Sequence, residues 1–256
     1  MSIDALSLRG ILLAVMLVGC VAPIGARADG LGNGFVFLDE IDPTIIQDMR
    51  YAGINNFTGR PLPGYRSARC VVKSAVAAAL KQVQADLAAS HLSLKMFDCY
   101  RPIRAVQAMV RWVGDGSIGG DKSYFPRTQK SALIQQGYIA SRSGHSNGTV
   151  VDLGLVDVTA AAEAADAVGG NGPCIAGNNA RAPNEADMGT SFDCFDPKSA
   201  TINGGLTRPQ QQHRAALVVA MVRHGFANYS REWWHFSFRG GSSGAFDFDI
   251  PARPKP

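Results

Sequence analysis

The sequence has little of what marks several large classes of protein. It contains no run of Lys or Arg and no basic stripe with interleaved aromatic residues, although 25 basic side chains outnumber 21 acidic ones. Nucleic-acid binding needs clustered contacts to phosphates, so this diffuse excess gives no reason to expect a nucleic-acid partner. The helical zinc-protease signature His-Glu-x-x-His is missing as well.

A long hydrophobic run is also missing near the N-terminus. The apolar stretch 11–19, which follows Arg9, is far shorter than the roughly 20 residues that span a bilayer, and it is typical of a secretory leader over residues 1–28. Two cleavage patterns overlap there. Residues 17–20 (LVGC) resemble a bacterial lipobox, which would place a lipid on Cys20, whereas 26–28 (ARA) form an ordinary small-x-small site. We expect export to the periplasm or cell envelope; the two cleavage patterns stay open, and only the lipobox alternative gives membrane contact, through a lipid anchor at Cys20.

Cysteine is scarce, and four of the five cysteines follow the expected leader. An even number in an exported chain suggests disulfides, and four cysteines permit three pairings. We favour Cys70–Cys99 and Cys174–Cys194, because the second pair brackets a loop rich in Gly, Asn, Ala and Pro that closure would stabilise. Four buried thiols are the alternative.

The rest of the chain is expected to form one domain over residues 29–256, since 46% hydrophobic residues suffice for a full core. Hydrophobic periodicity predicts helices over 70–89, 101–113 and 208–224, and strands over 92–97, 150–156 and 231–239. These elements alternate without a repeat, which predicts an α+β fold: a small, mainly antiparallel sheet flanked by helices. We expect residues 157–206 to be a loop-rich insertion.

Two segments concentrate the chemistry: residues 143–152 (SGHSNGTVVD) and 232–235 (EWWH). They supply two imidazoles and two carboxylates. A catalytic zinc site holds the metal with three protein ligands and leaves one position for a water, which a further carboxylate can deprotonate. We expect His145, Asp152 and His235 to bind one zinc ion on the sheet. Glu232 is then the base, although other divalent ions also suit these ligands.

The spacing of these residues demands bends in the chain. On a regular helix His145 and Asp152 would lie about 10 Å apart along the axis, and on a straight strand about 23 Å apart. The turn signal at 146–148 (SNG) lets the chain fold back between them. Residues three apart on a strand face opposite sides, so the chain must also bend near Trp233 to bring Glu232 and His235 together. A lone histidine is more often a core or surface residue than a metal ligand. His145 and His235 each have an acidic residue nearby in the sequence, which favours a metal site.

Seven ordered segments between about Phe35 and Ile250 carry a family resemblance: FLDE at 37–40, RYA at 50–52, NFTG at 56–59, DCYRP at 98–102, SGHSNG at 143–148, MGTSFD at 188–193 and EWWH at 232–235. The chain resembles the zinc D-alanyl-D-alanine dipeptidases of the vancomycin-resistance type. This resemblance implies hydrolysis of the free dipeptide D-Ala-D-Ala to two D-alanines, with one zinc ion per chain.

The resemblance also implies roles residue by residue. His145, Asp152 and His235 match the zinc ligands, and Glu232 matches the base. Arg101 matches the arginine that stabilises the oxyanion. Tyr51 and Asp193 match groups near the substrate ammonium, and Ser143 matches a group near the substrate carboxylate. A free dipeptide is charged at both ends, so an enclosed site needs an anion and donors to hold it. For Arg101 alone, a structural salt bridge is the alternative.

The sequence departs from the family pattern in three places: Cys99 replaces a common glycine, the insertion carries Cys174 and Cys194, and a leader is present. These departures fit an exported, disulfide-bonded member. Two other functions compete with the dipeptidase. One is a zinc D,D-carboxypeptidase that trims longer peptidoglycan peptides. The other is a non-catalytic, zinc-dependent wall-binding module, against which the intact Glu232 and Arg101 argue, because binding alone needs no general base.

Overall fold

The computed structural model describes residue 31 and residues 34–116, 120–159, 174–175, 184–241 and 244–252. The expected leader at 1–28, with Cys20, lies outside the described residues, as do 160–173 and 176–183 of the expected insertion. The division into leader, peptidase domain and insertion therefore stays a prediction. Among the helices described, none combines the length and apolar character needed to cross a membrane.

A five-stranded sheet forms the centre of the fold. Its order is β2 (Ile46–Gln47), β4 (Leu92–Asp98), β5 (Val150–Asp157), β7 (His235–Phe238) and β6 (Phe226–Asn228). The β2–β4 pair is parallel and the other three pairs are antiparallel. A second, antiparallel sheet pairs β1 (Phe35–Phe37) with β3 (Val71–Lys73). The predicted α+β class with a mainly antiparallel sheet is confirmed.

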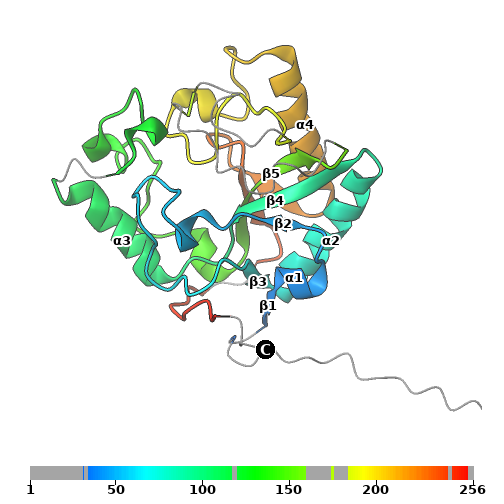
Figure 1. The fold of residues 1–256 in the computed structure, drawn as a ribbon, viewed down its shortest axis with the longest axis horizontal. Coiled ribbons are helices and arrows are strands. Elements are labelled where there is room, and N and C mark those ends of the chain that lie inside the picture. The colour runs from blue at the N-terminus through cyan, green and yellow to red at the C-terminus, as the bar shows by residue number, and fades with distance from the viewer. Residues whose placement is uncertain are drawn as a thin grey trace, which may run out of the picture.

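The helices lie on two sides of this sheet (Figure 1). They are α1 (Leu38–Ile41), α2 (Ser74–Ala88), α3 (Ile103–Gly114) and α4 (Arg208–Arg223). α2 contacts both α4 and β4, whereas α3 lies across the molecule from them. α4 begins at a capping box, in which Thr207 and Gln210 bond each other's backbone, and Gly225 at φ 88° follows its end. Short 3₁₀ helices cover Arg50–Ala52, Lys122–Tyr124, Lys130–Ala132, Gly144–Asn147 and Pro197–Ser199.

Two predicted boundaries were wrong. The helix expected from residue 70 begins only at Ser74, because Val71–Lys73 pair with β1 as a strand. The strand expected over 231–239 begins only at His235, because the preceding residues form a turn. In both places the hydrophobic pattern continues across the boundary, so periodicity alone does not mark it. Trp233 and Trp234 are core residues, 3% and 1% exposed.

Both favoured disulfides are present. Cys70–Cys99 joins the segment before β3 to the residue after β4, across 29 positions of sequence. Cys174–Cys194 closes a loop of 20 positions. All four cysteines are buried. The two disulfides lie beside different parts of the candidate site.

Candidate metal centre and its cavity

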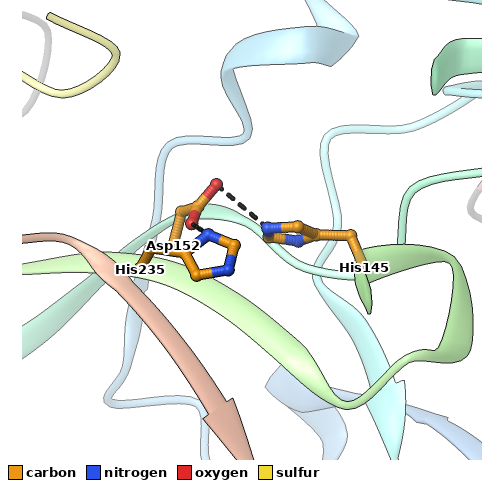
Figure 2. Close-up of side chains that lie close together, drawn as sticks. All are labelled: His145, Asp152 and His235. Atoms are coloured by element: carbon orange, nitrogen blue, oxygen red, sulfur yellow. Dashed lines mark hydrogen bonds and ion pairs between the residues drawn. The ribbon is translucent and has the colours of Figure 1, made fainter. Parts of the chain in front are cut away.

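Three side chains converge at the centre of the sheet (Figure 2). Asp152 on β5 lies opposite His235 on β7 in the strand register, so these two side chains meet across neighbouring strands. His145 reaches them from the 3₁₀ helix before β5, and Gly148 at φ 72° turns the chain between that helix and the strand. One ligand atom from each of the three residues lies within 4.8 Å of the others.

The hydrogen bonds of His145 prepare it to bind a cation. Its Nδ1 lies 2.8 Å from the carbonyl oxygen of Cys99, so Nδ1 carries the proton and donates it. Its Nε2 is buried and has no hydrogen-bond partner among the described residues. This Nε2 lies 3.2 Å from Oδ2 of Asp152, so two lone pairs face each other. A cation between them would satisfy both, in the arrangement typical of metal-binding histidines.

The other half of the centre is Asp152 with His235. Nδ1 of His235 lies 2.9 Å from Oδ1 of Asp152. Burial raises the pKa of Asp152, but the two histidines outweigh burial and hold this pKa below its ordinary value. Asp152 is therefore an ionised acceptor between two imidazoles. Two nitrogens and one carboxylate oxygen form a donor set that fits one divalent metal ion.

Asp98, at the end of β4, connects this centre to its surroundings. Its fully buried carboxylate accepts hydrogen bonds from Tyr65 Oη at 2.7 Å and from Arg101 Nε at 2.9 Å, and lies 3.3 Å from Nδ1 of His145. One carboxylate thus orients both a histidine of the candidate metal centre and an arginine. Sequence reasoning gave Asp98 no role. Its position three residues before Arg101, in the DCYRP segment, was the available signal.

Arg101 lies between Asp98 and the metal centre. Its Nη2 is 2.9 Å from Asp98 and 3.5 Å from Asp152, and its guanidinium lies 4.9 Å from the centre of the Tyr51 ring. The structural salt bridge considered above is present, yet the same side chain lines the cavity. Arg101 is therefore a fixed cation at the cavity wall.

Glu232 lies in the turn before β7. Hydrogen bonds from its own amide to the Tyr229 carbonyl, and from the His235 amide to its carbonyl, form the bend. This bend places Oε2 of Glu232 3.7 Å from Nδ1 of His235. Burial raises the pKa of Glu232 to about 7, and His235 opposes that effect. A divalent cation nearby would favour the carboxylate and lower this pKa.

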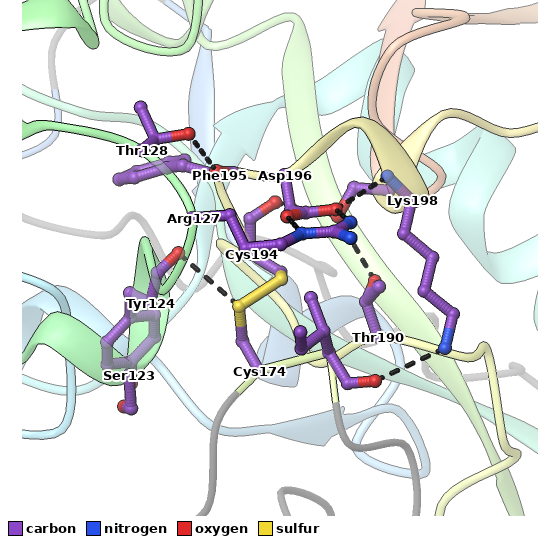
Figure 3. The surroundings of a disulfide bond; sticks show 12 residues. Ser123, Tyr124, Arg127, Thr128, Cys174, Thr190, Cys194, Phe195, Asp196 and Lys198 are labelled. Atoms are coloured by element: carbon purple, nitrogen blue, oxygen red, sulfur yellow. Dashed lines mark hydrogen bonds and ion pairs between the residues drawn. A yellow bond between two sulfur atoms is a disulfide. The ribbon is translucent and has the colours of Figure 1, made fainter.

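Across the cavity, Tyr51 donates its hydroxyl to Oδ2 of Asp193 at 2.7 Å. Asp193 is 5% exposed, and burial raises its pKa well above the ordinary range, with a further contribution from Asp152. Its φ of 58° is uncommon for a residue with a side chain. We name the segment that holds it, residues 188–200, the Asp193 loop. The disulfide Cys174–Cys194 ties this loop to Cys174 through the residue that follows Asp193 (Figure 3).

A single cavity of about 230 Å³ joins these groups. Its wall includes all eight residues selected from the sequence: Tyr51, Arg101, Ser143, His145, Asp152, Asp193, Glu232 and His235. Tyr138, Tyr229 and Trp234 also line it, and no pattern in the sequence marked the two tyrosines. The cavity therefore combines a metal centre, a fixed cation, a spare carboxylate and a buried carboxyl at the opposite wall.

The segment 144–148 has the Gly-x-Ser-x-Gly spacing of serine-hydrolase nucleophiles. The structure excludes that role for Ser146. It is 2% exposed, its hydroxyl donates to the carbonyl of Arg101 at 2.8 Å, and it lies within a 3₁₀ helix rather than after a strand. The glycines serve the turn that presents His145 instead.

Comparisons with known proteins agree with this site. The D-Ala-D-Ala dipeptidase model of the M15 peptidases matches residues 32–167 and 173–250. The D-alanyl-D-alanine dipeptidase of Enterococcus faecalis is 34% identical over 205 residues, covering 80% of this chain and 91% of that protein. The corresponding protein of Enterococcus faecium is 32% identical, covering 86% and 98%, and that of Streptomyces coelicolor is 33% identical, covering 85% and 97%.

One solved structure, a vancomycin resistance D,D-pentapeptidase VanY in complex with Zn(II), is 14% identical with a TM-score of 0.36, over 77% of this chain and 88% of that chain. That likeness is too weak to support conclusions. The family match includes every residue of the cavity named above, and these three relatives each cover 80% or more of the chain. The chain belongs to the D-Ala-D-Ala dipeptidase family of the M15 metallopeptidases.

Proposed function

We propose that this protein is a zinc-dependent dipeptidase that hydrolyses D-Ala-D-Ala to two D-alanines. The observation that carries the proposal is the convergence of His145, Asp152 and His235 in one cavity with Glu232 and Arg101. The relatives named D-alanyl-D-alanine dipeptidase supply the substrate. A zinc ion held by the three ligands would polarise the scissile carbonyl and lower the pKa of its water toward about 7.

Glu232 is the proton carrier in this proposal. Its carboxylate lies 3.7 Å from Nδ1 of His235 and lines the same cavity. The attacking water forms a bond to the carbonyl carbon and gives its proton to Glu232. Glu232 then delivers this proton to the amide nitrogen as the C–N bond breaks, and one D-alanine leaves with its amino group restored. No further acid is needed, because the same carboxyl serves in both directions.

Arg101 stabilises the negative charge that develops on the carbonyl oxygen. Its bonds to Asp98 fix the guanidinium before substrate arrives, so no reorganisation is needed when charge develops. Aromatic contact with Tyr51 limits its movement further. Such a preorganised donor contributes most in a site from which water is excluded.

The two charged ends of the substrate meet different walls. We assign the ammonium to Asp193 and Tyr51, and the carboxylate to Ser143. Longer wall peptides continue from the amino side of their terminal D-Ala-D-Ala and have no ammonium there. The carboxyl of Asp193 is 5% exposed and Tyr51 is 2% exposed, which supports a closed site for a charged amine rather than an open groove. This favours the dipeptidase over the carboxypeptidase.

The test is D-alanine release by the purified, zinc-loaded protein from D-Ala-D-Ala, L-Ala-L-Ala and a pentapeptide that ends in D-Ala-D-Ala. We expect turnover of the free D,D-dipeptide alone. Cleavage of the pentapeptide would move the assignment to a D,D-carboxypeptidase. Metal binding without turnover of any of the three would favour the wall-binding module.

We further propose that the protein acts in the bacterial envelope, where it recovers D-alanine from D-Ala-D-Ala outside the cytoplasm. The leader-like sequence at 1–28 and two disulfides in one chain support this location. Fractionation of the native organism tests it. Recovery of the protein in the cytosol with residues 1–28 intact would contradict export, and absence of lipid on Cys20 would select the simple signal peptide.

A further inference from the structure

Arg214 on α4 is a buried cation outside the cavity with an unusual set of partners. Its side chain is 1% exposed, and no carboxylate within the described part of the chain forms an ion pair with it. Burial lowers the pKa of Arg214 to about 10, which reflects the free-energy cost of placing a guanidinium there. A cation in such a place is retained only where hydrogen bonds satisfy it.

Those hydrogen bonds all go to main-chain carbonyls at the two ends of the Asp193 loop. Nε donates to the carbonyl of Met188 at 2.7 Å. Nη1 and Nη2 both donate to the carbonyl of Lys198 at 3.1 Å, and Nη1 also donates to that of Ala200. A single planar guanidinium therefore joins the start of the loop to its end, ten residues and more apart in sequence.

Inside this bracket side-chain contacts add to the backbone hydrogen bonds that the loop makes to Cys174 and Tyr124. The Ser199 hydroxyl donates to the Cys194 carbonyl at 2.6 Å and lies 3.2 Å from the Thr190 hydroxyl. Trp233, next to Glu232, donates its indole N–H to Thr190 at 2.8 Å. Asp193 at φ 58° lies between these contacts, and this backbone conformation needs the surrounding loop to hold it.

We infer that Arg214 is a positioning residue for substrate recognition: by bracketing the Asp193 loop it holds the Asp193 carboxyl against Tyr51, where the substrate ammonium binds. This inference rests on the proposed function. It assigns a role in substrate affinity to a side chain that does not touch the cavity. The metal centre, held by β5, β7 and Asp98, does not depend on it.

The experiment compares full-length Arg214→Met and Arg214→Lys with the wild type. Methionine keeps the apolar stem and removes every donor, whereas lysine keeps the charge and donates from one atom. We expect the KM for D-Ala-D-Ala to rise about tenfold in Arg214→Met and by a smaller factor in Arg214→Lys, as coupled contacts of this size allow. Zinc affinity, measured by chelator competition, should stay within about threefold of the wild type, since its ligands lie elsewhere. The matched control is Arg223→Met on the same helix, whose side chain is 64% exposed.

A double-variant cycle separates positioning from general destabilisation. If Arg214 acts through Asp193, adding Arg214→Met to Asp193→Asn should raise KM no further. Additive effects on KM, or an unchanged KM in folded Arg214→Met, would overturn the inference. If Arg214→Met does not fold, the same cycle with Arg214→Lys decides.

A readout without turnover keeps this test independent of the proposed function. Hydrogen exchange of amides 188–200 should quicken in the Arg214 variants, while amides 150–157 of β5 keep their protection. Equal exchange rates in the variants and the wild type would contradict the claim that Arg214 holds the Asp193 loop in place. A wild-type protein that releases no D-alanine would instead contradict the proposed function alone.

Discussion

The two ends of the cavity are built in different ways. The metal end comprises the three candidate ligands His145, Asp152 and His235, and two of them are in register on neighbouring strands, β5 and β7. The opposite end presents Asp193 from a loop in which one short 3₁₀ helix is the regular element. Each end has its own disulfide: the carbonyl of Cys99 accepts a hydrogen bond from His145, and Cys194 directly follows Asp193.

This difference shows two ways in which a fold can position functional side chains: through the register of a sheet, or through contacts within a loop. On the sheet, strand register places the ligands, and the outer contacts of Asp98 and Cys99 only orient them. In the loop, a disulfide, a buried guanidinium and an indole must supply what the register supplies elsewhere. The two ends should therefore respond to separate substitutions: metal affinity to one set and substrate affinity to the other.

The largest effect should come from a residue that belongs to neither end. Glu232→Gln removes the proton acceptor and should lower kcat by about 10³-fold, within the range for a general base. Zinc affinity and KM should change little, because the amide fills the same space. Glu40→Gln, at an exposed glutamate, is the control. Residual turnover near the wild-type value would show that another group carries the proton.

At the metal end, Asp98→Asn should weaken zinc binding by about 10- to 100-fold, the usual cost of losing a contact that orients a metal ligand. KM of the fully zinc-loaded variant should stay close to the wild-type value. Chelator competition followed by kinetics at saturating zinc measures both quantities. Asp86→Asn, at a surface carboxylate, is the matched control. A rise in KM with unchanged zinc affinity would contradict the assignment of metal affinity to this end of the cavity.

At the other end, Asp193→Asn should raise the KM for D-Ala-D-Ala about tenfold, because the bound ammonium favours the ionised form of the Asp193 carboxyl and so a charge-assisted bond, which an amide cannot form. Zinc affinity should not change. Steady-state kinetics with D-Ala-D-Ala and zinc titration of the same sample are sufficient. An unchanged KM would place the substrate ammonium elsewhere in the cavity.

Removing one disulfide at a time tests whether each disulfide supports only its own end of the cavity. Replacing both cysteines of either pair by serine should cost about 3 kcal/mol of stability. Below the melting temperature, loss of Cys70–Cys99 should weaken zinc binding by a few-fold, and loss of Cys174–Cys194 should raise KM by a few-fold, in line with modest couplings. The same change in both variants would mean that the disulfides stabilise only the whole fold.

The smallest effect concerns pH and the stability of the zinc-free protein. Burial holds the pKa of Asp193 well above its value in an unfolded chain, so the folded protein retains a proton that the unfolded chain has lost. Its contribution to the free energy of unfolding therefore decreases as pH rises from the unfolded pKa toward the folded one. In Asp193→Asn the free energy of unfolding does not decrease in this way, because the amide does not titrate. This variant should therefore melt a few degrees above the wild type at pH 8, with less difference at pH 4. Equal differences at both pH values would contradict the raised pKa.

The sequence predicts the local bends of the candidate site better than its tertiary contacts, for a physical reason. A turn signal at 146–148 and the three-residue spacing of Glu232 and His235 are local, and they require bends that the structure contains. The helix start at Ser74 and the strand start at His235 depend on pairing with distant segments, which periodicity does not reveal. The bracket formed by Arg214 and the network of Asp98 arise from tertiary contacts between residues that carry no shared pattern.

Zinc titration of the metal-free protein, followed by D-alanine release from D-Ala-D-Ala, tests the central claim most directly. If His145, Asp152 and His235 hold one catalytic ion, activity should be absent without metal, rise linearly with added zinc and stop rising at one equivalent. His145→Ala should remove this break point. Turnover of the dipeptide by the metal-free protein, or an equal response to zinc in His145→Ala, would contradict the account.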